Sequence, residues 1–369
     1  MAEKLKLGII GCGMISDIYL KNIADMFGDR LQAVACADIV EEKVRACARK
    51  YGIRAESVDE LLADGEVEAV LNLTIPSSHA SVSLRAIRAG KHVYSEKPLA
   101  TKFSEAEELV GEAEARGLYI GCAPDTFLGG GYQTVRALLD EGAAGTPVLA
   151  NAFLLSKGPE SFHPNPAFFY KEGAGPLFDM GPYYITALVA LFGPVKSVAA
   201  VAKSAGPYRY KPSGEKFPCE TATHVSAVLN FESGLVANLT TSWDMNFSYW
   251  QSGLPLVEIF GSAGAIICPD PNTFCGITAL PMKETGHGVQ VRQGGGEFVS
   301  VPLRDERYIA NSRGLGLYKM AVAIREGGAH PASGRLALHV LEVMCAALRS
   351  QEEGRTIELK TRCERPQTL

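Results

Sequence analysis

The tripeptide Glu96-Lys97-Pro98 is the segment best placed to do chemistry, because it directly follows a short apolar stretch that is expected to be a strand, 92–95. A Gly-rich turn lies far upstream, and the sequence between the two alternates strand and helix. This order predicts that Lys97 lies at the carboxyl end of a late strand of a doubly wound parallel sheet, where such sheets bind ligands. An ammonium group there is suited to handling the hydroxyl proton of a bound substrate. The alternative is a solvated surface lysine.

The Gly-rich turn, Gly11-Cys12-Gly13-Met14-Ile15-Ser16, fits the pattern Gly-x-Gly-x-x-small. Gly11 makes the tight turn, Gly13 lets the backbone approach a pyrophosphate, and the helix N-terminus then faces the phosphates with free N–H groups. Asp38 follows Ser16 by about 22 residues, where the dinucleotide fingerprint expects an acid. The pattern predicts a dinucleotide site; the alternative is an ordinary glycine turn.

Asp38 also bears on the choice of dinucleotide. Its carboxylate can accept hydrogen bonds from the adenosine ribose and would repel a 2′-phosphate. Ile39 and Val40 follow, so no Arg or Lys stands there to receive that phosphate. We therefore expect NAD(H) in preference to NADP(H). The alternative is that Asp38 only caps the next helix.

The elements that must position these residues form two regions with different patterns. Up to about residue 123 strands and helices alternate, which predicts a parallel Rossmann-type sheet with helices on both faces. We expect strands at 5–10, 31–37, 69–73, 92–95 and 118–122, and helices at 15–26, 41–51, 78–89 and 104–116, with a short helix capped by Ser57.

After residue 123 long strands without regular helical crossovers dominate. Residues 224–231 alternate apolar and polar side chains and return through 235–243 as a hairpin, and 256–260 pairs with 265–268. Helices are expected at 131–140, 316–326 and 336–350, and polar connections at 204–218 and 283–296. The prediction is a second α/β domain, 124–369, built on a large, mostly antiparallel open sheet.

The bulk composition excludes several classes. A net charge of −5 argues against a nucleic-acid surface, and the apolar stretches are shorter than the ~20 residues that a bilayer requires. The nine cysteines contain no Cys-x-x-Cys pair, which favours free thiols in a reducing compartment, and we expect a cytoplasmic protein. The histidines are dispersed and show no zinc-type spacing, so no metal site is expected.

Further motifs complete a family resemblance. Thr74-Ile75-Pro76 with His79, Ala89-Gly90-Lys91-His92-Val93, and Glu96-Lys97-Pro98-Leu99-Ala100 occur in the order and spacing of the glucose-fructose oxidoreductase / inositol dehydrogenase / MocA (Gfo/Idh/MocA) family, which the chain resembles. Residues 173–183, Gly-Ala-Gly-Pro-Leu-Phe-Asp-Met-Gly-Pro-Tyr, are similar to that family's Gly-Gly-Gly-x-x-x-Asp-x-Gly-x-His. The motif matches run from Gly8 to Tyr183, and the later strands fit in arrangement only.

The resemblance implies an NAD-dependent dehydrogenase in which Lys97 is catalytic and Asp179 and Tyr183 complete the site. It also implies that the free face of the open sheet makes a homodimer or homotetramer. The implied cofactor contacts are Gly11, Gly13, Met14, Ile15, Asp38, Ile39, Thr74, Pro76, His79, Glu96 and Lys97.

Tyr183 departs from the family pattern, which often has His there. A tyrosine with its usual pKa of about 10 is a poor base, and lowering that pKa by ~3 units costs roughly 4 kcal/mol. One ammonium about 4 Å away at intermediate dielectric supplies about that much, so Lys97 alone can activate Tyr183 if the two are close. The alternatives are that Tyr183 is a half-buried helix tyrosine, that Asp179 is an N-cap, and that His163 is the base.

Four residues are candidates for substrate contact: Asp125, Thr126, His163 and Tyr184. The expected reaction is reversible hydride transfer between NAD and a secondary hydroxyl of a sugar, polyol or sugar derivative. A redox-neutral elimination or glycoside cleavage with retained NAD is an alternative, as is a non-catalytic NAD-binding regulator.

Overall fold

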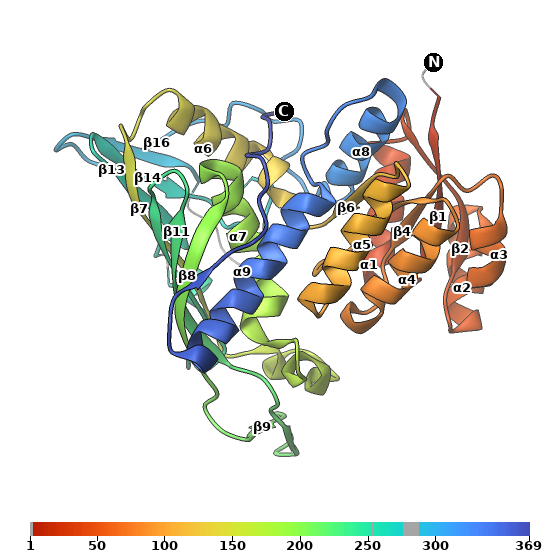
Figure 1. Ribbon diagram of the computed structural model, residues 1–369, viewed down its shortest axis with the longest axis horizontal. Helices are drawn as coiled ribbons and strands as arrows, with labels where there is room; N and C mark the ends of the chain where they lie inside the picture. The colour runs from red at the N-terminus through yellow and green to blue at the C-terminus, as the bar shows by residue number, and fades with distance from the viewer. Residues whose placement is uncertain (1–2, 253, 276–287) are drawn as a thin grey trace. The chain divides into compact units, whose positions relative to one another are not determined.

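The computed structural model describes residues 3–252, 254–275 and 288–369 (Figure 1). It forms two compact units, one of residues up to Asp125 together with Ser312–Leu341, the other of Thr126–Asn311 with Glu342–Leu369. Residues 312–341, which a boundary at residue 123 assigns to the second domain, therefore pack with the first unit. Among the helices that the structure describes, none has the length and apolar character needed to span a membrane.

The first unit contains the parallel Rossmann-type sheet that the sequence predicts. Its six strands have the order β3-β2-β1-β4-β5-β6, so the chain moves outward from β1 and then returns to β4 on the other side. Ligands of such sheets bind at this switch point, outside the carboxyl ends of the strands. The strands are β1 (Leu5–Ile10), β2 (Leu31–Ala37), β3 (Arg54–Ala55), β4 (Ala69–Asn72), β5 (His92–Ser95) and β6 (Ile120–Cys122).

The helices of the first unit are defined by local end signals. Ser57 and Glu60 form a reciprocal capping box at the start of one helix, and Gly52 ends another in the left-handed conformation. One helix begins at Pro76 rather than near Ser78, because a proline at the first helical position has no N–H to leave unsatisfied. The helices are α1 (Met14–Asp25), α2 (Glu41–Tyr51), α3 (Val58–Ala63), α4 (Pro76–Arg88), α5 (Phe103–Ala115) and α8 (Leu315–Glu326).

The second unit is built on a nine-stranded sheet of order β16-β15-β14-β13-β7-β12-β11-β8-β17 (Figure 1). The β12–β7 pair is parallel and its neighbours pair antiparallel, which confirms the expected large, mostly antiparallel sheet. The strands are β7 (Pro147–Leu155), β8 (Val195–Lys203), β11 (His224–Phe231), β12 (Val236–Ser242), β13 (Val257–Gly261), β14 (Gly264–Cys268), β15 (Gln290–Gln293), β16 (Val299–Ser300) and β17 (Ile357–Glu358).

One face of this sheet is buried. Alternate residues of β11, from Val225 to Phe231, are buried, and the helices α6 (Gly130–Asp140) and α7 (Gly175–Phe192) contact the sheet. Short 3₁₀ segments connect the unit, namely η1 (Thr126–Leu128), η2 (Pro159–Ser161), η3 (Pro166–Tyr170) and η4 (Tyr249–Gln251). The long helix α9 (Gly334–Glu353) contributes residues to both units.

Two segments expected to be polar connections contain strands. Residues 204–218 hold an antiparallel hairpin of β9 (Tyr208–Tyr210) and β10 (Lys216–Pro218), and β15 lies within 283–296, of which 283–287 are outside the described residues. The prediction failed for 204–218 because such short strands show no alternating apolar pattern. The hairpin is anchored instead by one apolar residue, Phe217, which is buried against Tyr170.

His330 makes the stability of the first unit dependent on pH. Its side chain is buried, its Nε2 lies 3.2 Å from the carbonyl oxygen of Ile120, and burial lowers its pKa to about 4. Since the folded state holds this histidine neutral while the unfolded chain protonates it near pH 6.5, stability is lost as pH falls through this window.

We expect wild-type protein to lose about 2 kcal/mol more than His330→Gln in its free energy of unfolding between about pH 7.5 and about pH 5. Urea unfolding at the two pH values measures this difference. Equal losses in both proteins would show that His330 does not titrate differently in the folded and unfolded states.

Candidate active site

The glycine turn between β1 and α1 has two glycines with different tasks. Gly11 has a φ of +105°, and a Cβ there would lie 2.5 Å from the carbonyl carbon of Leu73. Gly13 is the N-cap of α1 with an ordinary φ of −81°, and a Cβ there would meet no atom of the described residues within 4 Å. The fold therefore requires Gly11, whereas Gly13 faces open space in front of the free N–H groups of α1, which suits a phosphate.

Asp38 connects the glycine turn to the end of β2. Its Oδ2 accepts a 2.8 Å hydrogen bond from the Cys12 N–H, and its Oδ1 accepts one of 2.9 Å from the Val40 N–H. Asp38 contacts the start of α2 through the N–H of its N-cap, Val40, but it also bonds to Cys12 in the glycine turn, so it does not act on this helix alone. Each carboxylate oxygen keeps a second lone pair that can accept a hydrogen bond from a ribose hydroxyl.

Large apolar side chains are exposed just after three of the parallel strands. Met14 is 90% exposed, Ile39 98% and Ile75 65%, and these residues follow β1, β2 and β4. Exposed apolar side chains at the ligand-binding edge of a sheet suit contact with an apolar part of a ligand. The cofactor contacts predicted from the sequence for Met14 and Ile39 stay predictions, and Ile75 shares their exposure.

His79 links the loops that follow β4 and β5. The side chain is 1% exposed, with Nδ1 2.7 Å from the Pro98 carbonyl oxygen and Nε2 3.0 Å from that of Thr74. Burial lowers the pKa of His79. Because both ring nitrogens face backbone oxygens, the structure gives His79 a positioning task for these loops. The cofactor contact predicted for it stays a prediction.

The Glu96 side chain orders the start of the Glu96-Lys97-Pro98 segment after β5. Its Oε1 accepts a 2.7 Å hydrogen bond from the buried Tyr19 hydroxyl, and its Oε2 accepts one of 3.0 Å from the Lys97 N–H. Lys97 itself is half-buried, unlike a solvated surface lysine. Its backbone is thus held at the carboxyl edge of the sheet, as the sequence predicts.

Asp125 occupies a structural position in the first unit. It is 1% exposed, and its Oδ2 accepts hydrogen bonds from the N–H groups of Gly314 (2.9 Å) and Gly316 (3.0 Å) at the start of α8. Burial raises the pKa of Asp125 to about 6. These bonds connect residues 189 and 191 positions apart, and the substrate contact predicted for Asp125 stays a prediction.

In the second unit, Asp179 and Tyr183 lie four residues apart on α7, so they share a helix face. The N-cap of α7 is Ala174, so the alternative that Asp179 caps this helix is wrong. Tyr183 is buried, with 8% of its surface exposed. Pro182, inside the helix, has no N–H to donate to the Phe178 carbonyl.

The other residues of the second unit that were predicted to contact substrate are buried or hydrogen-bonded within the protein. Tyr184 is 1% exposed, and burial raises its pKa well above the usual value. The Thr126 hydroxyl is buried and donates a 2.6 Å hydrogen bond to the Pro271 carbonyl. His163 is half-buried, and its Nδ1 accepts a 3.1 Å hydrogen bond from the Asn165 N–H. Their substrate contacts stay predictions.

An ion-pair network beside the His163 segment was missed from the sequence. Arg209 lies 2.5 Å from a Glu160 carboxylate oxygen and 2.6 Å from one of Asp244, and all three side chains are at most 16% exposed. Glu160 belongs to η2, three residues before His163. The three charges come from separate segments with no motif spacing, so no local signal in the sequence could have identified them.

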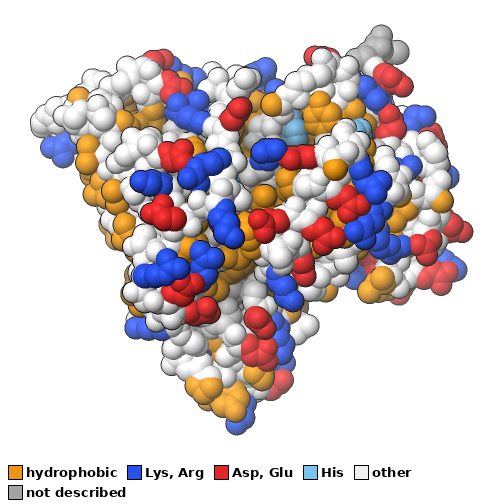
Figure 2. Space-filling model, viewed as in Figure 1, with side chains coloured by type: hydrophobic (Ala, Val, Ile, Leu, Met, Phe, Trp, Pro, Cys, Tyr) orange, Lys and Arg blue, Asp and Glu red, His pale blue; other side chains and the backbone are white. Residues whose placement is uncertain are grey.

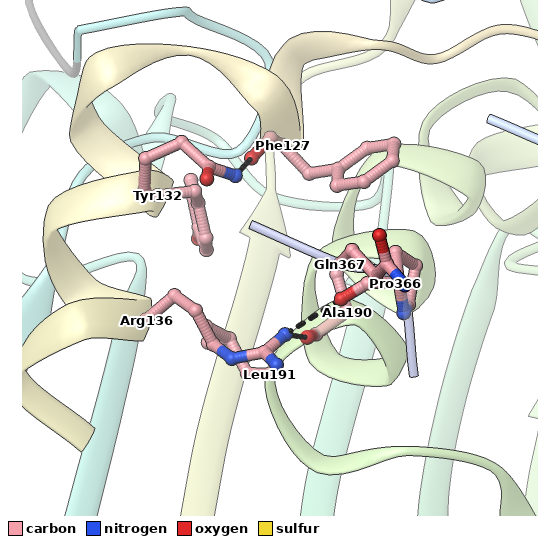
Figure 3. Close-up of a pocket in the computed structure, with 8 residues that line it drawn as sticks. Phe127, Tyr132, Arg136, Ala190, Leu191, Pro366 and Gln367 are labelled. Atoms are coloured by element: carbon pink, nitrogen blue, oxygen red, sulfur yellow. Dashed lines mark hydrogen bonds between the residues drawn. The ribbon is translucent and has the colours of Figure 1, made fainter. Parts of the chain in front are cut away.

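A small pocket in the second unit is not the substrate site (Figure 3). Its cavity volume is about 10 Å³, enough for about one water molecule. Arg136 of α6 donates hydrogen bonds across it to the carbonyl oxygens of Ala190 (2.8 Å) and Pro366 (3.0 Å). The pocket therefore belongs to the attachment of the C-terminal segment to α7.

Comparison with protein families assigns both parts of the chain. Residues 5–123 match the model of the oxidoreductase family with an NAD-binding Rossmann fold, and residues 132–267 match the GFO/IDH/MocA C-terminal domain. The chain belongs to the Gfo/Idh/MocA family. The first unit thus contains the NAD(H)-binding domain of this family, in agreement with the open space at Gly13.

Individual Gfo/Idh/MocA relatives are distant. Inositol 2-dehydrogenase of Salmonella typhimurium is 30% identical over 153 residues, 40% of this chain and 45% of that protein. The 1,5-anhydro-D-fructose reductase of Ensifer adhaerens is 25% identical over 356 residues, 96% and 98% of the two chains. The match spans only about half the length of the first curated relatives.

Solved structures carry the same fold. Levoglucosan dehydrogenase in complex with NADH and L-sorbose superposes with a TM-score of 0.81 at 19% identity, over 97% of this chain and 99% of that chain. At this identity the likeness shows the fold.

The two glycines give a matched pair of variants for the NAD site. Gly13→Ala should change the free energy of unfolding by only about 1 kcal/mol or less, yet weaken NADH binding on the order of 10-fold, because the new Cβ occupies the phosphate space. Gly11→Ala should lose roughly 2 kcal/mol or more, because its positive φ and the Leu73 backbone both oppose a side chain. Urea unfolding and NADH fluorescence titration measure the two effects, and unchanged NADH affinity in Gly13→Ala would contradict this placement.

Proposed function

We propose that the protein is an NAD(H)-dependent oxidoreductase that transfers hydride to or from a secondary hydroxyl of a sugar, polyol or sugar derivative. The observation that carries this proposal is the edge of the first sheet. There, open space at Gly13, exposed apolar side chains and the ordered Glu96-Lys97 segment follow neighbouring parallel strands. This is the arrangement that a bound dinucleotide and a fixed cation beside its reactive end require.

Asp38 supports NAD over NADP. Both of its oxygens are fixed by backbone N–H groups, so a negative charge stands where the adenosine ribose binds in folds of this type. The exposed residue after it is Ile39, which offers no positive charge to a 2′-phosphate.

Three side chains are proposed to do the chemistry. Bound NAD supplies the hydride acceptor or donor. Lys97 polarises the substrate oxygen with its ammonium group, Tyr183 moves the hydroxyl proton, and Asp179 holds the substrate and Lys97 in register. Lys97 belongs to the first unit and the other two residues to the second, so their meeting at one reacting carbon is part of the proposal.

The substrate class is supported by the family. An inositol dehydrogenase, an anhydrofructose reductase and a levoglucosan dehydrogenase, by their names, act on polyols or sugars. On the face drawn in Figure 2, basic and acidic side chains are interspersed, which together with the net charge of −5 favours a small neutral ligand over nucleic acid.

Monosaccharides and inositols, screened with NAD and with NADP, should give NADH formation with at least one compound and a lower Michaelis constant for NAD. Lys97→Ala should lower turnover with that compound by about 10²–10⁴-fold while NADH binding is retained, because acid–base and polarising assistance of this size is removed. Lys102→Ala, an exposed lysine nearby, is the control.

Near-normal turnover in Lys97→Ala would refute the proposed role of Lys97. Substrate conversion without net NADH formation would instead indicate the redox-neutral reaction. A lower Michaelis constant for NADP would overturn the assignment to Asp38.

We further propose that the protein is a homodimer or homotetramer that pairs through the outward face of the second sheet. Val201, Val228 and Val236 lie on neighbouring strands β8, β11 and β12, and between 36% and 61% of each residue is exposed. Strand register places them on the same side, opposite to the buried Val225–Phe231 set. An exposed apolar strip of this kind marks an association surface.

Val228→Lys should shift the sedimentation coefficient to that of a monomer, because an ammonium group would then have to be buried between the two remaining valines of the strip. Val148→Lys, an exposed valine of β7 whose side chain points to the other side of the sheet by strand alternation, should leave assembly unchanged. A wild-type protein that sediments as a monomer would contradict this proposal.

A further inference from the structure

Three cysteines that are scattered in the sequence meet in the first unit. Cys12 lies in the glycine turn, Cys36 on β2 and Cys47 on α2, and their sulfur atoms all lie within 4.8 Å of one another. All three are free thiols. This cluster could not be recognised from the sequence, because the fold, and not a Cys-x-x-Cys spacing, brings the residues together.

The cluster is enclosed but accessible. Cys36 and Cys47 are buried, whereas Cys12 is partly exposed. The Cys12 thiol donates to the Ala37 carbonyl oxygen at 3.6 Å and the Cys36 thiol to that of Val44 at 3.7 Å. Thiols are weak donors, so these long bonds do little to oppose a stronger ligand for the sulfur atoms.

The spacing suits a metal ion. With Zn–S bonds of about 2.3 Å, the sulfur atoms of a tetrahedral site are separated by about 3.8 Å, so side-chain shifts of about 1 Å or less would bring the three sulfurs to a common ion. Thiolate ligands select soft ions such as Zn²⁺ and Cu⁺ over Mg²⁺ or Ca²⁺. Three protein ligands leave a further position on a tetrahedral ion for water or another exogenous ligand.

We propose that Cys12, Cys36 and Cys47 form a binding site for one thiophilic metal ion of the Zn²⁺ type. The site lies outside the predicted cofactor contacts except at the Cys12 turn, and it does not depend on the proposed function. An ion held there would link the glycine turn, β2 and α2, because each of the three segments would supply one sulfur ligand.

The electrostatics of the cluster agree with this placement. Proximity to the Cys12 and Cys36 thiols lowers the pKa of Cys47, and the charge of Lys50 favours the thiolate while that of Asp17 opposes it. The same proximity raises the pKa of Cys12. Because a metal ion binds thiolates, its binding releases the thiol protons.

The first test measures metal affinity on the full chain after reduction and removal of metal. Titration with Zn²⁺ against a chromophoric chelator should give one ion per chain, and Cd²⁺ should produce a thiolate-to-metal charge-transfer band. Cys47→Ala should weaken binding on the order of 10- to 100-fold, and Cys36→Ala likewise. Cys268→Ala removes a buried cysteine of β14 in the second unit and is the control that should bind normally.

A second test needs no variant, so it stands even if a substitution disturbs folding. Zn²⁺ should slow alkylation of Cys12 in the wild-type protein by about 10-fold or more, as measured by peptide mass spectrometry, and leave the partly exposed Cys219 unaffected. Binding that is equally tight in Cys47→Ala, or equal alkylation of Cys12 with and without Zn²⁺, would overturn the metal site. NADH titration of the same samples reports separately on the proposed function.

Discussion

The close approach of two backbone segments, Gly11 and Leu73, is the constraint on which the candidate site depends. A side chain at Gly11 would overlap the Leu73 carbonyl group, so the turn after β1 and the loop after β4 lie in direct contact. Further contacts connect the neighbouring loops: His79 joins the β4 loop to Pro98, and Glu96 joins the start of the Lys97 loop to Tyr19 on α1. The predicted cofactor edge is thus one connected set of backbone positions.

Sequence reasoning reached this edge because its signals are local. The glycine spacing, the acid at Asp38 and the strand–helix alternation each depend on residues close together in the chain, and the parallel sheet with the order of a doubly wound fold agrees with them. Ser57 as a helix cap and Gly52 as a helix end were recognisable for the same reason. Backbone sterics and capping chemistry do not require knowledge of the tertiary fold.

The features that escaped prediction depend on packing between distant segments. Asp125 is satisfied by Gly314 and Gly316, Arg209 gathers carboxylates from two other segments, and the three cysteines come from a turn, a strand and a helix. Asp125 became a substrate candidate because a polar residue follows the last parallel strand there, and the structure adds its bonds at the start of α8. The sequence shows which polar groups are present, whereas only the fold shows which of them already have hydrogen-bond or ion-pair partners within the protein.

The two carbonyl oxygens beside His79 limit the hydrogen bonds that its ring can make. A neutral imidazole has a single ring N–H, while both oxygens that face it, on Thr74 and Pro98, are acceptors only. The ring can therefore donate a hydrogen bond to only one of the two carbonyl oxygens, and its other nitrogen presents a lone pair to the second. The tautomer of the buried ring therefore decides which loop receives this hydrogen bond. With the proton on Nε2 it is the loop after β4, and with the proton on Nδ1 it is the loop after β5.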